Sequence, residues 1–137
     1  MILSKKDLID CLRSDRAAMG FNDKNLIKQI LLGREYEVSL MIYIMRLRKM
    51  ELVQNRYNSK KTAFNFIRYY IWRQYFWWYR KKKNIFIDPN VFGPGLKIVH
   101  PGYIWVDNSA EIGSNCTILP RVLLGKKRPG IAPPIFL

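Results

Sequence analysis

Histidine and cysteine are the residue types that this sequence nearly lacks. Its only histidine is His100, so one chain cannot supply a multi-histidine metal site, and no metal is expected. The two cysteines, Cys11 and Cys116, lie far apart, and neither belongs to a C-x-x-C pair. Because the sequence contains no secretory signal peptide, we expect both to be reduced, buried thiols in a cytoplasmic protein.

Acidic residues are also scarce. The 137 residues include 24 Lys and Arg against 10 Asp and Glu, which gives a formal net charge of +14. This charge favours an anionic partner, whether nucleic acid, a membrane surface or a phosphorylated cofactor, without choosing among them. An apolar run of ~20 residues is missing as well. The nearest candidate, Thr62–Tyr79, is interrupted by Arg68 and Arg73, which argues against a transmembrane span.

Apolar residues are present in a proportion, 49%, that can build a core and argues against global disorder. The first half has a helical pattern. Ser4 and Asp7 form a capping-box pattern that predicts a helix from Lys5 to about Met19. Three further helices are expected over residues 23–32, 37–53 and, capped by Ser59, 60–82.

The composition changes near Asn84. From there onward Gly, Pro, Asn and Asp punctuate short apolar runs. We therefore divide the chain into a helical subdomain, residues 1–83, and a second subdomain, residues 84–137.

The last predicted helix and its basic end, residues 62–83, are rich in aromatic side chains. Ten of the eighteen residues in Thr62–Tyr79 are Phe, Tyr or Trp, and the basic run Arg80–Lys83 follows. The simplest interpretation is a helix packed on both sides with a solvated basic end. A second is attachment to the anionic inner face of a membrane, where lysines meet lipid phosphates. Nucleic-acid binding is the least favoured, although aromatic side chains beside basic ones can stack bases.

A six-residue repeat organises the second half. Counting in steps of six from Phe86 as far as Val122 meets only apolar side chains. Counting from Asp88 instead meets His100 and then four aliphatic residues. A period of six fits a short strand followed by a tight corner, and three such strands make one triangular coil. The pattern predicts an α+β protein, with a helical subdomain followed by the first two to three coils of a left-handed parallel β-helix.

These repeats resemble a known family, the serine acetyltransferase-like hexapeptide-repeat acyltransferases. Gly95–Val106, which reads GLKIVHPGYIWV, is similar to the family's active-site stretch. There a glycine precedes an apolar run, a histidine, a second glycine and an aliphatic strand. Ala110–Gly113 is similar to the family's A-x-I-G unit, and residues 122–127 resemble its strand leading into an extended loop. Arg13–Arg16 and Ile42–Leu47 are similar to helical segments of the same proteins.

The resemblance implies acetyl transfer from acetyl-CoA to a hydroxyl group, with His100 as general base. An imidazole suits this role because its unperturbed pKa, ~6.5, lies near neutral pH. Asp88 is the nearest carboxylate that could orient the histidine. Lys126 and Lys127, in the loop, are expected to meet the CoA phosphates. These β-helices usually form trimers with active sites between neighbours, so a homo-oligomer is expected.

The sequence also departs from the family pattern. Val99 and Ala132 stand where serine acetyltransferases have an acceptor-contacting aspartate and a second active-site histidine. A sugar hydroxyl of a polysaccharide precursor is therefore as plausible an acceptor as serine. The chain stops where relatives continue with further coils, so we expect a truncated member or an end buried by another subunit. The alternative function is an inactive remnant or interaction module, associated with a membrane surface.

Overall fold

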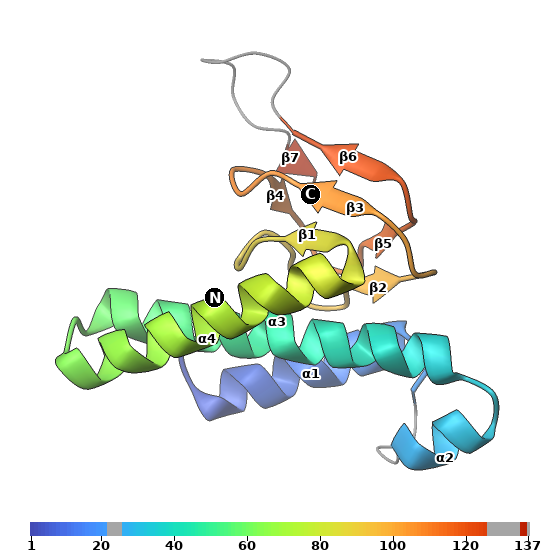
Figure 1. Cartoon of the computed structure of the whole chain (residues 1–137), viewed down its shortest axis with the longest axis horizontal. Helices are drawn as coiled ribbons and strands as arrows, with labels where there is room; N and C mark the ends of the chain where they lie inside the picture. Colours follow the sequence, from blue (N-terminus) through green and yellow to red (C-terminus); the bar gives the residue numbers. More distant parts are fainter. Residues whose placement is uncertain (22–25, 126–134, 137) are drawn as a thin grey trace.

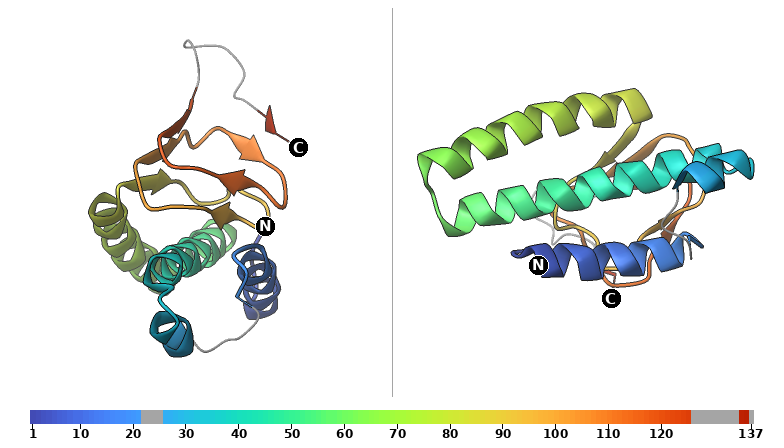
Figure 2. Two further views of the ribbon diagram at one scale, coloured as in Figure 1. Left: turned by 90° about the vertical axis from the view of Figure 1, so that its right-hand side faces the viewer. Right: turned by 90° about the horizontal axis from the view of Figure 1, so that it is seen from below.

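The first half of the chain forms a layer of helices, and the strands of the second half lie on one side of that layer (Figure 1). The structure is a computed structural model that describes residues 1–21, 26–125 and 135–136. The longest helix lies between two others, with its neighbours on opposite sides (Figure 2). The helices are α1 (Lys5–Ala18), α2 (Leu26–Leu31), α3 (Glu35–Ser59) and α4 (Ala63–Lys83), with α3 in the centre.

Helix α1 begins as its capping pattern predicts. The Asp7 backbone N–H donates to the Ser4 hydroxyl at 3.0 Å, and the Ser4 backbone N–H donates to the Asp7 carboxylate at 2.8 Å. These bonds satisfy donors that the first turn of a helix leaves without partners. The helix ends at Ala18, next to the predicted end at Met19.

The other helices differ from their predicted bounds. Helix α2 covers Leu26–Leu31 of the predicted 23–32, and residues 22–25 lie outside the described part of the chain. Helix α3 continues beyond Val53 to Ser59, because the buried Asn55 side chain donates to the Ile2 carbonyl and so holds this end of the helix. Ser59 therefore belongs to α3. The cap of α4 is Thr62, whose hydroxyl accepts the Asn65 backbone N–H at 3.2 Å.

Helix α4 ends at Lys83, and Asn84 closes it in a left-handed conformation with φ of 55°. No helix in the described residues is long and apolar enough to cross a membrane.

Seven short strands follow, and they pair only in parallel among the described residues. One sheet holds the first, third and sixth strands, a second sheet the second and fifth, and a third sheet the fourth and seventh. The chain is thus an α+β protein in which a helical part precedes short parallel strands. The strands are β1 (Ile85–Ile87), β2 (Lys97–Ile98), β3 (Ile104–Val106), β4 (Glu111–Ile112), β5 (Thr117–Ile118), β6 (Val122–Leu124) and β7 (Ile135–Phe136).

The uninterrupted six-residue count from Phe86 is wrong at its beginning. Ile85, not Phe86, pairs with Ile104. The distance along the chain from Ile85 to its partner Ile104 is therefore one residue longer than the distance from Ile104 to its partner Val122. Ile85 and Ile87 are consequently buried, while Phe86 is only half-buried. The second sheet departs from the count as well, because Ile98 pairs with Ile118 and not with Cys116, which lies three steps of six beyond it. Within each of the two series, three successive positions are nevertheless buried: Ile98, Ile104 and Ala110 in one, and Val106, Ile112 and Ile118 in the other.

One hydrophobic core continues from the helices into the strands. Its centre includes Tyr43 of α3, which is completely buried. The Tyr43 hydroxyl donates to the Ile85 carbonyl at 3.0 Å and accepts from the Ile87 backbone N–H at 3.4 Å. Burial raises the pKa of this phenol, although the Ile87 bond opposes the shift, so the hydroxyl stays protonated. A single side chain thus joins α3 to both ends of β1.

Tyr43→Phe should lower the free energy of unfolding by about 1–3 kcal/mol, because two buried backbone groups of β1 lose their partner. Urea denaturation followed by circular dichroism measures the change. The matched control is Tyr36→Phe, at a tyrosine that is 65% exposed, where no measurable change is expected. Equal stability of the two variants would contradict the role assigned to the Tyr43 hydroxyl.

Candidate functional site

His100, the predicted general base, lies at an exposed corner shortly after β2. Ile98, the last residue of β2, is buried, whereas the His100 side chain is exposed. Asp88 and His100, which belong to the six-residue series that continues with four aliphatic residues, are both outside the core, unlike the later members Val106, Ile112 and Ile118. The imidazole is therefore accessible to solvent and to small molecules.

Close packing with the next turn of the chain fixes the backbone on both sides of His100. A Cβ added to Gly102 would lie 2.6 Å from the Pro120 Cβ, so only glycine lets these two corners approach each other. A Cβ on Gly93 would lie 2.8 Å from the backbone carbonyl carbon of Gly113. Gly95 has φ of +86°, and its missing Cβ leaves room for Asn115. The glycines of the family-like stretch thus have a packing role.

Asp88, the residue expected to orient His100, has another partner in the structure. Its carboxylate forms an ion pair with Arg80 in the last turn of α4. Across the described residues, no hydrogen bond joins Asp88 to His100. The structure does not bring the two predicted catalytic residues together, because the guanidinium on the neighbouring helix engages the carboxylate.

The remaining predictions concern the loop and metal binding. Lys126 and Lys127, which were expected to meet CoA phosphates, lie outside the described residues, and so does Ala132. In the part of the chain that the structure covers, no group of three or more His, Cys, Asp or Glu side chains could hold a metal ion.

A buried charge cluster that was not predicted from the sequence lies where α1 and α3 meet the strands. Arg48 of α3 donates to the Asp15 carboxylate from Nε at 2.8 Å and from Nη2 at 3.1 Å. Its Nη1 contacts both Glu51 oxygens at 3.1 Å. All three side chains are buried. Burial alone would lower the pKa of Arg48, but Asp15 and Glu51 outweigh it and raise that pKa, so the guanidinium stays charged.

The same cluster holds the chain that leads into β2. Arg48 donates to the Phe92 carbonyl at 2.8 Å and to the Gly93 carbonyl at 2.7 Å. Asp15 accepts the backbone N–H groups of Gly95 and Leu96, each at 2.9 Å. The segment just before His100 is therefore anchored to two helices by charge-assisted hydrogen bonds, which are the stronger kind.

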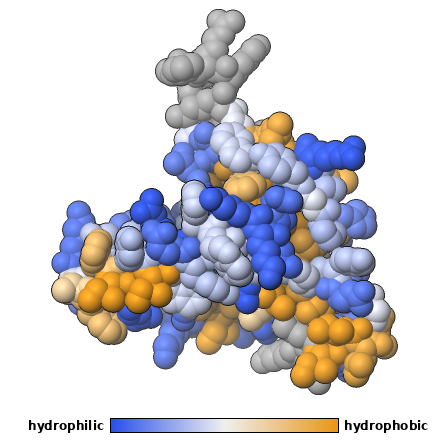
Figure 3. Space-filling view, viewed as in Figure 1, coloured by the Kyte–Doolittle hydropathy of each residue, from blue (hydrophilic) through white to orange (hydrophobic). Residues whose placement is uncertain are grey.

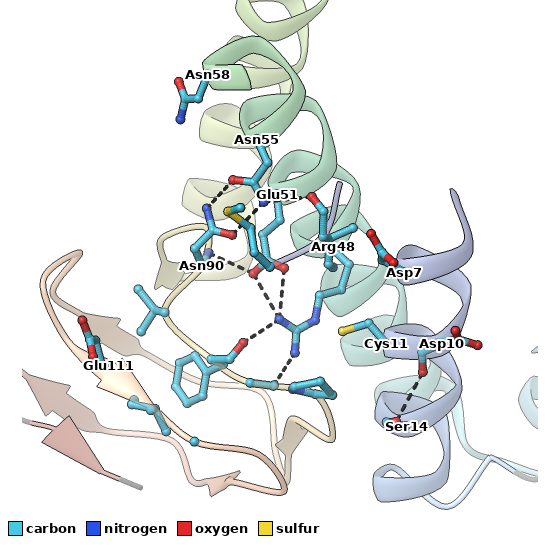
Figure 4. A pocket seen from close by; sticks show the side chains of 18 residues that line it. Asp7, Asp10, Cys11, Ser14, Arg48, Glu51, Asn55, Asn58, Asn90 and Glu111 are labelled. Carbon is cyan, nitrogen blue, oxygen red and sulfur yellow. Dashed lines mark hydrogen bonds and ion pairs between the residues drawn. The ribbon is translucent and has the colours of Figure 1, made fainter. Parts of the chain in front are cut away.

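An open cavity of about 820 Å³ lies beside the cluster, between α1, α3, residues 90–94 and β4 (Figure 4). Arg48 reaches from α3 toward Glu51 and the 92–93 backbone at its centre (Figure 4). Burial raises the pKa of the Cys11 thiol in its wall to about 12, although Arg48 opposes the shift. A protonated thiol is a poor nucleophile. His100 does not line this cavity, whose buried groups bond to one another and to the backbone.

Comparison of the chain with protein-family models, with curated proteins and with solved structures found no match.

Arg48→Met should lower the free energy of unfolding by about 3–5 kcal/mol, because two buried carboxylates lose their counter-charge. Arg13→Met is the matched control. Arg13 pairs with Asp10 on the surface of α1, where both side chains are more than half exposed, so its loss should cost about 0–1 kcal/mol. Chemical denaturation of both variants checks the difference, and similar losses would contradict a dominant role for the buried cluster.

Proposed function

We propose that this chain is an acetyl-CoA-dependent O-acetyltransferase that resembles serine O-acetyltransferase, with His100 as general base. The observation that carries the proposal is the setting of His100. The only histidine of the chain is exposed at a corner between parallel strands. The segment around it is the one that resembles the active-site stretch of the family.

We also propose that β1–β7 belong to the first coils of a left-handed parallel β-helix. Two regularities support this architecture. From β2 onward the chain visits its three sheets in a constant order, and each return forms a parallel pair. A parallel bridge between Phe92 and Ile112 adds the third side before β2. Buried aliphatic side chains recur at six-residue steps in two series, Ile98, Ile104 and Ala110 in one and Val106, Ile112 and Ile118 in the other. Such regularity is typical of repeat architectures, in which each turn buries its apolar side chains against the next.

The proposed chemistry needs one proton transfer and one acyl transfer. His100 takes the proton of the acceptor hydroxyl as that oxygen attacks the thioester carbonyl carbon of acetyl-CoA. The carbon–sulfur bond then breaks, and the CoA thiolate leaves with the proton that the imidazole returns. The products are an acetyl ester and free CoA. Because Asp88 is engaged by Arg80, the imidazole must be oriented by another group.

We propose that the chain forms a homo-oligomer, trimeric as in the family, in which a neighbouring copy encloses the site around His100. The neighbours of His100 along the chain include exposed apolar side chains, among them Tyr103 at 47% and, on the next turn, Leu119 at 55%. A facing copy would cover these side chains and enclose the imidazole. The acceptor that we propose is a small hydroxyl compound, either serine or a sugar of a polysaccharide precursor.

The test measures free CoA released from acetyl-CoA in the presence of serine, homoserine and sugar acceptors. His100→Asn should reduce the rate by about 100-fold or more, the contribution expected of a general base. Because His100 is exposed, the variant should keep the melting temperature of the parent protein. Asp88→Asn is the control, since its ion pair with Arg80 makes it a structural residue, and its rate should stay within about threefold of the parent.

Two results would count against acetyl transfer. One is no CoA release with any acceptor, together with a melting temperature that CoA leaves unchanged. That outcome favours the alternative function, an inactive remnant or interaction module. The other is a His100→Asn variant as active as the parent protein, which would remove His100 from the chemistry.

A further inference from the structure

Helix α4 presents a broad apolar face that no other part of the described chain covers. The helix lies at the edge of the helical layer and packs against α3 and β1 (Figure 2). Only Phe76 and Tyr79 are buried in its 21 residues. The outward side therefore faces solvent along nearly the whole length of the helix.

Two apolar stripes run side by side along this outward face, interrupted before their tryptophans by the exposed Gln74. Their members recur four and seven residues apart, a spacing that keeps side chains on one side of a helix. Each of these side chains is between 49% and 60% exposed. The first stripe is Phe66, Tyr70 and Trp77, and the second is Ile67, Ile71 and Trp78. We call these six residues the α4 stripes.

Cations lie at the tryptophan end of the α4 stripes. The Lys81 Nζ is 3.5 Å from the centroid of the Trp77 ring, and the Lys82 Nζ is 5.4 Å from that of Trp78. The surrounding chain offers these lysines no local acid. Between Glu51 and Asp88 the sequence contains nine Lys or Arg and no Asp or Glu. This helix carries a concentrated share of the net positive charge.

We propose that the outer face of α4 docks on the surface of an anionic lipid bilayer. The helix lies in the plane of the interface, with the α4 stripes entering the boundary between headgroups and acyl chains. Trp77 and Trp78 sit at headgroup level, and Lys81 and Lys82 extend their ammonium groups to lipid phosphates. This inference does not depend on acetyl transfer.

The shape and composition of the surface favour a lipid bilayer over nucleic acid. Figure 3 looks onto the face of the molecule that carries α4, with an apolar area over the beginning of the helix and hydrophilic side chains over its end. Ile67 and Ile71 have no ring on which a base could stack, and they gain most from an apolar phase. A single exposed helix also forms no groove that could track a phosphate backbone.

The experiment uses sucrose-loaded vesicles of phosphatidylcholine, with or without phosphatidylglycerol, and sediments them with the full chain. The protein should sediment with the anionic vesicles and not with the neutral ones, and high salt should release it because salt screens surface charge. Tryptophan emission should shift to shorter wavelength on binding, as the exposed indoles leave water.

Paired substitutions separate the two contributions. Lys81→Gln with Lys82→Gln should weaken partitioning roughly 30-fold, as expected for two lysines near an anionic surface. The control is the same double change at Lys5 and Lys6 of α1, which are also exposed. This control variant has the same net charge as the Lys81→Gln and Lys82→Gln variant, and it should keep most of the binding. Melting temperatures of both variants should equal that of the parent protein.

A second pair tests the apolar contacts. Trp77→Ser with Trp78→Ser should abolish both sedimentation and the emission shift. Ile27→Ser with Leu31→Ser removes two exposed apolar side chains of α2, at 70% and 82%, and should leave binding within about twofold of the parent.

Three outcomes would overturn the proposal. They are no sedimentation with anionic vesicles, equal binding to neutral vesicles, and binding that survives loss of both the lysine pair and the tryptophan pair. Preferential binding to single-stranded polyuridylate, with vesicles unable to compete, would instead assign the face to nucleic acid. Because none of these measurements includes acetyl-CoA, a negative result here says nothing against the proposed transferase, and the converse holds as well.

Discussion

The structure depends on the satisfaction of one buried cation. An isolated ammonium or guanidinium is very costly to remove from water, so Arg48 is tolerated only where acceptors surround it. Asp15 on α1 and Glu51 on α3 supply opposite charge, and the carbonyls of Phe92 and Gly93 supply neutral acceptors. These acceptors come from three parts of the chain: α1, α3 and the segment that precedes β2. The helices and the strand segment must therefore assemble together before the guanidinium is satisfied.

This requirement extends to the corner that carries the histidine. Asp15 uses one oxygen for Arg48 and for the backbone N–H groups of Gly95 and Leu96, so its placement fixes where β2 begins. His100 follows β2 within two residues. The glycine contacts with the next turn act on the same segment from the other side. The backbone that carries His100 is therefore held from two sides, while the imidazole itself is exposed.

Local chemistry explains which features could be predicted from the sequence. The capping box at Ser4 and the six-residue apolar steps from Ile98 to Ala110 and from Val106 to Ile118 depend on nearby residues, and both are present. The extra residue between β1 and β3 could not be predicted, because steps of six from Phe86 also fall on apolar residues and give no sign of the shift. The ion pair of Asp88 with Arg80 could not be predicted, because distance along the chain does not reveal which side chains are close in space. Chain proximity misleads wherever a tertiary partner is closer in space.

Arg48 was overlooked for a related reason, although the sequence held a signal. Arg48 lies three or four residues from Ile44 and Glu51, and so it shares the buried side of α3 with them and with Asn55. A prediction from apolar periodicity places charged residues in solvent, and it therefore did not identify Arg48 as buried. A charged residue in phase with an apolar stripe indicates a buried pair. The opposite holds on α4, where the outward side chains are apolar and the local cations have no acidic neighbour in sequence. Helix α3 thus buries a charge that Asp15 and Glu51 neutralise. Helix α4 instead exposes apolar side chains beside lysines that have no acidic neighbour in sequence. Only α4 could therefore gain stability by contact with an external anionic surface.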